Sequence, residues 1–134
     1  MTFWENKRVI VTGSNGFLGS TLLKLLVEAG ADTVGFDLHS TSPSIRALGL
    51  EGRVPIIRGS VTDLEQIERA MLNRRVEICF HLAGLSNIRE NSRNPLHAFD
   101  VNVRGTWTVL EACRRVSSLL GVVCASSNHV YGFQ

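Results

Sequence analysis

The sequence lacks the features that mark membrane, secreted and nucleic-acid-binding proteins. Its purely apolar runs extend over only a few residues, too few for a helix that crosses a bilayer. Residues 1–6 do not show the charged, apolar and small-residue order of a signal peptide. A net charge of +2, with scattered arginines and no interleaved aromatics, favours neither nucleic acid nor an acidic partner. We therefore expect a cytoplasmic protein.

Cysteine is scarce as well. The three cysteines, Cys79, Cys113 and Cys124, match neither a zinc-ligand spacing nor a C-x-x-C motif. Cys79 and Cys124 fall in apolar, strand-like runs, and Cys113 falls in a helical pattern. We expect all three to be buried, reduced, structural thiols, and we expect no metal site.

A strand, a glycine turn and a helix follow one another near the N-terminus. The apolar run Val9–Val11 predicts a buried strand, and glycines follow it at positions 13, 16 and 19. Leucines at helical spacing begin at Leu18. Glycine lets such a turn leave the strand sharply, approach a pyrophosphate closely and pack the helix on the strand. The free N–H groups of the helix then hold the anion, although three glycines at this spacing also suit a purely structural turn.

A carboxylate stands where a dinucleotide-binding unit needs one. The second apolar run, 33–36, ends in Asp37, which follows Gly13 by 24 residues. In such units an acid about 20 residues after the first glycine accepts hydrogen bonds from the adenosine ribose. The alternative is that Asp37 only caps a turn.

Strand-like and helical segments alternate along the whole chain. Its 134 residues, 44% of them hydrophobic and 19% charged, have an ordinary composition for one globular domain. Strands are expected at about 7–12, 33–37, 54–58, 77–82 and 121–126, and helices at about 16–29, 63–73 and 95–118. The alternation predicts an α/β fold, a doubly wound, Rossmann-like parallel sheet with strand order 3-2-1-4-5, truncated after the fifth strand.

Capping residues agree with the helix boundaries. Asp63 is expected to cap the helix that follows it, with Gln66 as its capping-box partner. Asn94 and Pro95 open the long helix, since proline suits the first turn.

Small and polar residues gather at the carboxyl ends of the expected strands. In open parallel sheets, ligands bind beyond these ends. The stretches that meet there are 12–13, 37, 59–61, 81–84 and 125–128. Their agreement predicts one ligand site at this edge of the sheet.

Together these segments resemble the N-terminal part of the extended short-chain dehydrogenase/reductase family, and most of all its NAD-dependent sugar-nucleotide epimerases and dehydratases. The segments that carry the resemblance are TGSNGFLG at 12–19, FD at 36–37, HLAG at 81–84, NVRGTWTVLEACR at 102–114 and SSNHVYG at 126–132. The resemblance implies NAD as cofactor, a nucleotide-sugar as substrate, and hydride transfer to NAD through a keto-sugar intermediate. It also implies that residues 1–134 form a single, incomplete NAD-binding domain, without the C-terminal substrate domain.

The resemblance assigns roles to individual residues. The cofactor-binding residues that it implies are Gly13, Asn15, Gly16, Phe17, Leu18, Gly19, Asp37, Ser60, Val61, Leu82, Ala83, Gly84 and Asn102. Asp37 is expected to bind the adenosine ribose and to repel a 2′-phosphate, which favours NAD over NADP. Val61 is expected to pack against adenine, and Ser60 stands where the family usually carries Asp. His81, within an apolar run, is expected to be a packed core residue and not a ligand.

Ser127 is the residue that the resemblance implies for catalysis. In the family, a hydroxyl four residues before a tyrosine, here Tyr131, orients the sugar hydroxyl that is oxidised. Asn102 is expected to support the active site from the long helix. Candidate substrate contacts are Ser86, Asn87 and Asn128. Asn128 stands where 4,6-dehydratases carry an acid, and an amide is no general acid, so epimerase or reductase chemistry is favoured over dehydration.

The catalytic tyrosine and lysine of the family are missing from these residues. The family uses a Y-x-x-x-K motif, and Tyr131 is the only tyrosine, with no lysine four residues later. We expect the 134 residues alone to be inactive, as a fragment of a longer enzyme. One alternative is a short, non-catalytic NAD-binding sensor or interaction module. Another is a decayed site of which only the fold persists.

The expected long helix carries a stripe of large apolar residues. They are Leu96, Phe99, Val103, Trp107 and Leu110. We expect most of this stripe to pack on the sheet as ordinary core. The resemblance also places this helix in a dimer interface, so we expect a homodimer or other self-association, with no nucleic-acid or membrane partner.

Overall fold

A sheet of five parallel strands forms the centre of the molecule. The computed structural model describes residues 2–132, without the side chains of Asn128 and His129. The strands are β1 (Arg8–Thr12), β2 (Asp32–Asp37), β3 (Ile56–Arg58), β4 (Ile78–His81) and β5 (Gly121–Cys124). They pair in the order β3-β2-β1-β4-β5, which confirms the predicted Rossmann-like arrangement.

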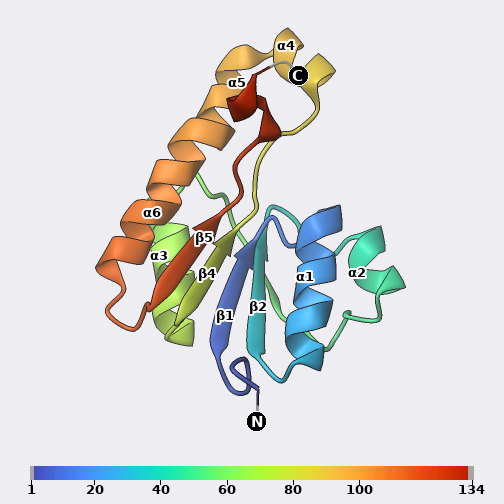
Figure 1. The fold of residues 1–134 in the computed structure, drawn as a ribbon, viewed down its shortest axis with the longest axis vertical. Coiled ribbons are helices and arrows are strands. Elements are labelled where there is room, and N and C mark those ends of the chain that lie inside the picture. Colours follow the sequence, from blue (N-terminus) through green and yellow to red (C-terminus); the bar gives the residue numbers. More distant parts are fainter. Residues whose placement is uncertain (1, 133–134) are drawn as a thin grey trace.

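Helices cover both faces of the sheet (Figure 1). The helical segments are α1 (Phe17–Glu28), α2 (Pro43–Ala47), α3 (Leu64–Arg74), α4 (Ile88–Arg93), α5 (Pro95–Phe99), the π-helical turn η1 (Asp100–Arg104), α6 (Gly105–Arg115) and the 3-10 turn η2 (Asn128–Tyr131). The helices α1 and α2 pack on one face, and α3 and α6 pack on the other. None of the described helices is long and apolar enough to cross a membrane.

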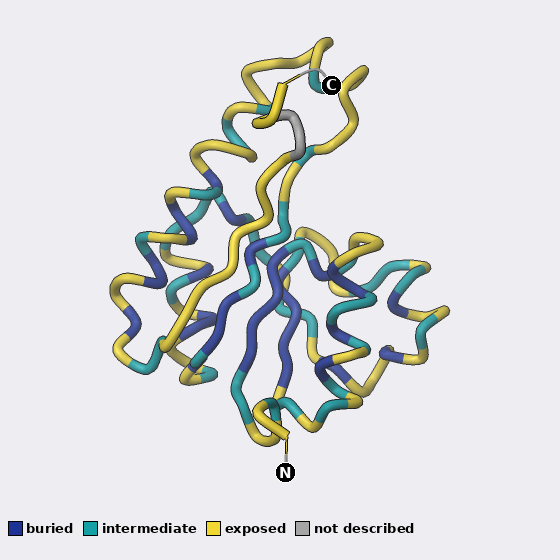
Figure 2. Tube along the Cα trace, viewed as in Figure 1, coloured by how far each residue is buried: buried dark blue, intermediate teal, exposed yellow. Residues whose placement is uncertain are grey.

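Two hydrophobic clusters meet at β1 because successive side chains of a strand point to opposite faces. Val9 and Val11 pack with Leu23 and Leu26 of α1, whereas Ile10 faces the cluster under α3 and α6. All five side chains are at most 3% exposed. The central strand is therefore buried on both faces, as the dark trace in Figure 2 shows.

Side-chain caps begin two of the helices as predicted. Asp63 accepts a hydrogen bond from the backbone N–H of Gln66 at 3.1 Å, and the Gln66 side chain donates to the same carboxylate at 2.8 Å. Asn94 caps α5, with Pro95 in the first turn. These caps satisfy N–H groups that have no partner within the helix.

The long helix predicted over 95–118 is interrupted. It consists of α5, η1 and α6, and the backbone N–H of Gly105 reaches back five residues to the carbonyl of Asp100. A step of five residues is π-helical, and such bulges are frequent at functional sites. Hydrophobic periodicity does not reveal the bulge because apolar residues recur every three to four positions on both sides of it. The short helix α4 was also not predicted.

The apolar stripe of this helix does not pack on the sheet, so that prediction is wrong. Its residues, from here on called the outer stripe, are Leu96, Phe99, Val103, Trp107 and Leu110, which are 41–82% exposed. The buried side of α6 instead carries small residues such as Gly105 and Ala112, with Val109 between them. Small residues let α6 lie close to the neighbouring elements, and the larger apolar residues are left on the outer side.

The strand β5 is exposed along its length, in contrast to β1 and β4 (Figure 2). Cys124 at its end is exposed, which corrects the prediction that all three cysteines are buried. The reason is that β5 is an edge strand with β4 as its only neighbour in the sheet of the described residues. Cys79 and Cys113 are buried, as predicted.

Candidate functional site

The turn after β1 requires glycine at two positions. Gly13 has a φ of +69°, and a Cβ atom there would lie 2.7 Å from the backbone nitrogen of Ala83. A Cβ atom on Gly19 would overlap the carbonyl oxygen of Gly13. The first position needs left-handed backbone and the second needs close approach of α1 to the turn. The turn, the helix and the segment after β4 therefore meet backbone to backbone.

The N-terminus of α1 offers free backbone amides beside this turn. Gly16 is the N-cap, and no described side chain caps the helix. The first N–H groups of a helix have no partner within it, so those of Phe17 and Leu18 stay available. Because the helix dipole adds positive charge at this end, the amides suit an anion such as a diphosphate.

Asp37 ends β2 next to the same turn, and two backbone amides fix its carboxylate. Its Oδ2 accepts a hydrogen bond from the N–H of Asn15 at 2.9 Å, and its Oδ1 accepts from the N–H of Leu38 at 2.8 Å. The N–H of Gly13 donates to the carbonyl of Phe36 at 3.0 Å. Each carboxylate oxygen has further lone pairs, so Asp37 can also accept hydrogen bonds from a ligand hydroxyl.

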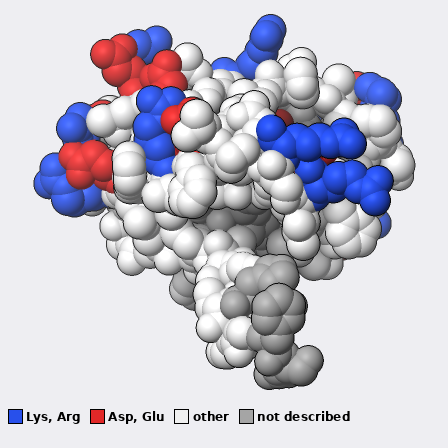
Figure 3. All heavy atoms as spheres, turned by 90° about the horizontal axis from the view of Figure 1, so that it is seen from above, with Lys and Arg blue, Asp and Glu red and all other residues white. Residues whose placement is uncertain are grey.

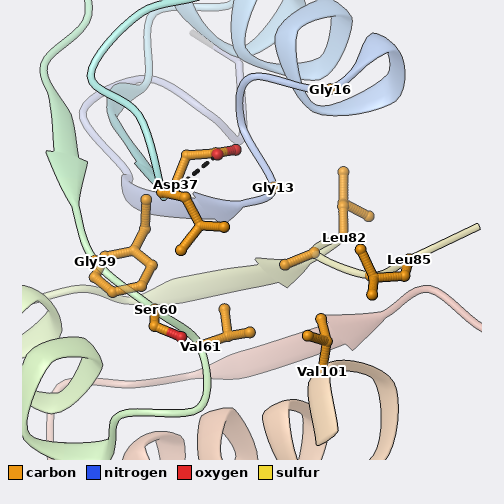
Figure 4. A pocket seen from close by; sticks show the side chains of 13 residues that line it. Gly13, Gly16, Asp37, Gly59, Ser60, Val61, Leu82, Leu85 and Val101 are labelled. Atoms are coloured by element: carbon orange, nitrogen blue, oxygen red, sulfur yellow. Dashed lines mark hydrogen bonds between the residues drawn. The ribbon is translucent and has the colours of Figure 1, made fainter. Parts of the chain in front are cut away.

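A cavity of about 230 Å³ lies among these segments. Its lining residues are Gly13, Gly16, Phe36, Asp37, Leu38, Gly59, Ser60, Val61, Leu82, Ala83, Gly84, Leu85 and Val101. In Figure 4 the carboxylate of Asp37 lies near the glycine turn, and the side chains of Val61, Leu82 and Val101 gather farther along. One oriented carboxylate beside apolar walls suits a ligand that combines a sugar with flat rings.

Eight of the thirteen predicted cofactor residues line this cavity. The five that do not line it are Asn15, Phe17, Leu18, Gly19 and Asn102. The predictions missed five lining residues, which are Phe36, Leu38, Gly59, Leu85 and Val101. Phe36 and Leu38 flank Asp37, so their position in the sequence could have identified them. Val101 lies in the π-helical turn, and no local pattern indicates that it reaches the cavity.

Ser60 and Val61 are held by local contacts. Ser60 Oγ lies 2.8 Å from Thr62 Oγ1 and accepts the Thr62 N–H at 3.2 Å. Its own N–H donates to Gln66 Oε1 at 3.0 Å. Val61 packs against α6, since a Cβ atom on Gly105 would lie 2.9 Å from Val61 Cγ2. The Ser60 hydroxyl thus stabilises the turn into α3, and Val61 forms a fixed apolar wall.

The segment after β4 is held from two sides. The carbonyl oxygen of Thr12 accepts a hydrogen bond from the N–H of Leu82 at 3.2 Å. The hydroxyl of Thr12 accepts one from the N–H of Ala83 at 3.3 Å. Asn102 Oδ1 accepts the N–H of Leu85 at 2.7 Å, and Asn102 Nδ2 donates to the Leu85 carbonyl at 3.0 Å. Asn102 therefore holds a cavity-lining segment without lining the cavity itself.

The predicted catalytic and substrate residues do not line the cavity. Ser127 follows β5 and is exposed, and Ser86 is exposed after β4. Asn87 caps α4 through its side chain. The side chain of Asn128 lies outside the described residues. The turn η2, which follows β5, and the helix α4 lie at the same end of the molecule in Figure 1, beyond the carboxyl edge of the sheet.

Few ionisable groups surround the site. Among the described residues that line the cavity, Asp37 is the only one with an ionisable side chain. Seen from above, charged side chains occupy the flanks of this face and its middle is uncharged (Figure 3). His81 is 2% exposed, as predicted for a packed residue, and burial lowers the pKa of its imidazole below 6.5. Asp37 is therefore the charge that a ligand meets in the cavity.

Comparison with known sequences gives matches over nearly the whole chain. Residues 9–134 match the model of the NAD dependent epimerase/dehydratase family. CDP-paratose 2-epimerase of Salmonella typhi is 31% identical over 128 residues, which are 93% of this chain and 38% of that protein. CDP-glucose 4,6-dehydratase of Salmonella typhimurium is 34% identical over 131 residues, which are 96% of this chain and 36% of that protein. The chain thus spans less than two-fifths of the length of these relatives.

Comparison with solved structures agrees with these sequence matches. UDP-glucose-4-epimerase of Stenotrophomonas maltophila, with bound NAD and formylated UDP-arabinopyranose, superposes with a TM-score of 0.85 at 26% identity, over 96% of this chain and 39% of that chain. UDP-glucose 4-epimerase of Thermus thermophilus, in complex with NAD, superposes with a TM-score of 0.73 at 32% identity, over 84% of this chain and 36% of that chain. The chain therefore belongs to the NAD dependent epimerase/dehydratase family.

Proposed function

We propose that this chain is the NAD-binding part of an epimerase, dehydratase or reductase that acts on a nucleotide-sugar. The observation that carries the proposal is the carboxylate of Asp37, fixed by two backbone amides beside a glycine turn and an apolar cavity. Family membership and the NAD complexes of two similar epimerases support the same cofactor. A cytoplasmic location is part of the proposal.

The residues present fit a dinucleotide. Glycine at positions 13 and 19 lets the turn, α1 and the segment after β4 approach one another closely, and the α1 amides beside the turn suit a diphosphate. Two buried polar atoms of the turn, Ser14 Oγ and Asn15 Oδ1, have no partner among the described residues. Buried polar atoms are nearly always satisfied, so the turn has polar capacity left for a ligand or for water.

Asp37 selects NAD over NADP in this proposal. Its carboxylate accepts hydrogen bonds from the two adenosine ribose hydroxyls, whereas a 2′-phosphate in the same place brings two negative charges together. Val61, which lines the same cavity, packs against adenine. No basic side chain lines the cavity among its described residues, so nothing there would neutralise the extra phosphate.

In the intact enzyme, bound NAD supplies the hydride acceptor for a sugar carbon. The residues of this chain bind the cofactor and orient the sugar. The α1 amides hold the diphosphate, Asp37 holds the ribose, and Leu82 and Leu85 exclude water from the cavity. Ser127 orients the sugar hydroxyl by a hydrogen bond, because a serine hydroxyl by itself is a weak base. The amide at Asn128 favours epimerisation or reduction over dehydration.

A competing proposal is a short, non-catalytic NAD-binding sensor or interaction module. The mass of the protein as its own cell makes it separates the two. A mass well above 14.7 kDa supports the enzyme, whose further sequence should then contain a Y-x-x-x-K motif. A mass of 14.7 kDa supports the module.

Calorimetric titration of the intact protein with NAD and with NADP tests the cofactor. We expect 1:1 binding of NAD and at least about tenfold weaker binding of NADP. Asp37→Ala should weaken NAD binding by about tenfold to 100-fold, as expected for losing hydrogen bonds to a charged group. Asp32→Ala, at the exposed opposite end of the same strand, is the matched control and should bind like wild type. Equal affinity of wild type and Asp37→Ala for NAD would contradict the proposal.

We also propose that the outer stripe is buried by self-association, in the simplest case as a homodimer. The stripe places five large apolar side chains, two of them aromatic, along one side of α5, η1 and α6. Contiguous apolar patches on a protein surface mark interaction sites.

A further inference from the structure

The imidazole of His81 lies between two threonine hydroxyls. Its Nδ1 is 2.7 Å from Thr12 Oγ1, and its Nε2 is 3.1 Å from Thr106 Oγ1. Thr12 ends the central strand β1, and Thr106 lies in the first turn of α6. The buried ring therefore joins the middle of the sheet to the helix that begins at the π-helical turn.

The neighbouring groups fix the direction of each hydrogen bond. The Thr106 hydroxyl donates to the carbonyl of Asn102 at 2.7 Å, so Thr106 Oγ1 must accept a proton from His81 Nε2. Thr12 Oγ1 accepts the N–H of Ala83, and its own proton goes to His81 Nδ1. The neutral ring with its proton on Nε2 satisfies both contacts.

Both ends of this chain of hydrogen bonds reach the cavity. At one end, Thr12 holds the backbone of Ala83. At the other end, Asn102 lies in η1 and binds both backbone polar groups of Leu85. Ala83 and Leu85 line the cavity two residues apart. His81 thus links the two contacts that hold the segment after β4.

We propose that neutral His81 is a positioning residue, which fixes the distance between β1 and η1 and so keeps the segment 82–85 in the shape that binds the cofactor. The inference rests on the proposed NAD binding. The carbonyl of His81 also accepts the N–H of Ala125 at 2.9 Å, two residues before Ser127. The same residue therefore ties the ends of β1, β4 and β5 and the start of α6 together.

Protonation of His81 would break its hydrogen bond with Thr12. A second proton on Nδ1 faces Thr12 Oγ1, whose hydroxyl proton then loses its acceptor on the ring. The charged and titratable groups on the elements packed around the ring are Arg8 of β1, Glu77 before β4, Cys79 of β4, Cys124 of β5, Asp100 and Arg104 of η1, and Glu111, Cys113, Arg114 and Arg115 of α6. None of them is a cause of the pKa shift, which comes from burial alone. The ring is therefore neutral at neutral pH, and acid should loosen the segment.

Substitution of Thr106 in the intact protein tests the link. Thr106→Val removes the hydroxyl and keeps the shape, so we expect NAD binding about tenfold weaker in calorimetry at neutral pH. Thr106→Ser keeps the hydroxyl and should bind within about twofold of wild type. Thr108→Val, a buried threonine two residues along α6, is the matched control and should bind NAD like wild type. Wild-type affinity in Thr106→Val, or a failure of serine to restore binding, would overturn the inference.

Substitution of His81 gives a second test, through the pH profile. His81→Gln keeps a donor for Thr106, and His81→Asn keeps an acceptor for Thr12. Because burial lowers the pKa of His81, wild-type NAD affinity should fall only in acid, at a pH below the ordinary histidine value of about 6.5. Both variants should bind NAD more weakly than wild type at neutral pH, and their affinity should not fall further in acid. If the fall persists unchanged in His81→Gln, another group causes it and the proposed role is wrong.

Measurements on the ligand-free protein separate this inference from the proposed cofactor. Nitrogen NMR should show His81 Nδ1 without a proton at neutral pH, and the amides of Ala83 and Leu85 should exchange with solvent about tenfold faster in Thr106→Val. If these results hold while wild type fails to bind NAD, the positioning network stands and the cofactor proposal fails. A proton on Nδ1, or unchanged amide exchange, overturns the network itself.

Discussion

The middle of the sheet and its β5 edge differ in how completely they are buried. Val9 and Phe36 of β1 and β2 are each 1% exposed, whereas Val122 and Val123 of β5 are 37% and 52% exposed. The carboxylate and the glycine turn of the candidate site follow the buried strands β2 and β1. A binding site needs a framework whose side chains are locked by packing, and the buried middle of the sheet provides one. The exposed β5 edge and the outer stripe are surfaces on which further protein can pack.

Matched leucine substitutions should give the largest difference between the two regions. Leu23 of α1 is fully buried under β1, and Leu110 of the outer stripe is 41% exposed. Leu23→Ala should lower the free energy of unfolding by about 2–5 kcal/mol, because it leaves a cavity in a packed core. Leu110→Ala should change the free energy of unfolding of the monomer by about 0.5 kcal/mol or less. Chemical denaturation at a concentration at which the intact protein is monomeric measures both, and equal losses would show that the outer stripe is core after all.

Glycine substitutions should give the next largest effect, on binding. Gly19→Ala places a methyl group against the carbonyl of Gly13, and the turn must move away from α1. We expect NAD binding to weaken by about tenfold to 100-fold, because the free-energy cost of overpacking would be subtracted from the binding free energy. Gly121→Ala in β5, where an added Cβ meets no atom within 4 Å, is the matched control. Unaltered affinity in Gly19→Ala would mean that the turn does not contact the cofactor.

A charge on the outer stripe should separate folding from association. Trp107 is 59% exposed, so Trp107→Glu should leave the free energy of unfolding of a monomer almost unchanged. Sedimentation velocity of wild type should show a dimer or larger species that dissociates on dilution, and the variant should sediment as a monomer. A monomeric wild type at high concentration would refute self-association.

Acid titration should give the smallest effect. Glu111 forms hydrogen-bonded ion pairs with Arg114 at 2.7 Å and Arg115 at 2.8 Å, and these bonds lower its pKa to about 2. A lowered pKa means that the unfolded state binds more protons, so the stabilisation is present above about pH 4.5 and is lost as the pH falls toward 2. Wild type should melt slightly above Glu111→Gln at neutral pH, and the difference should vanish in acid and shrink in salt. A difference that is unaffected by salt would point to packing instead.

The parts of the fold that short-range physics determines could be predicted from the sequence. The position of β1, the cap at Asp63 and the sharp turn at Gly13 all follow from residue types at fixed spacing. The strand order follows from alternating strands and helices with right-handed crossovers. The same reasoning placed Asp37 beside the glycine turn, where its carboxylate now accepts the N–H of Asn15.

The parts that depend on contacts distant in sequence could not be predicted. The periodicity of α6 shows that apolar residues share faces, but it does not tell which face meets the sheet. The burial of Gly105 and Ala112 in the structure shows that the side with the small residues faces inward. The π-helical turn brings Val101 to the cavity and Asn102 to Leu85. The spacing of apolar residues does not indicate this turn either. The exposure of Cys124 likewise depends on which strand lies at the edge of the sheet.

A crystal structure of the intact protein with NAD tests the central claim most directly. We predict that the adenosine ribose hydroxyls donate hydrogen bonds to the carboxylate of Asp37 and that the diphosphate accepts them from the amides of Phe17 and Leu18. We also predict that the cofactor passes along Ala83 and Leu85. NAD bound elsewhere, or a ribose that makes no contact with Asp37, would contradict the account.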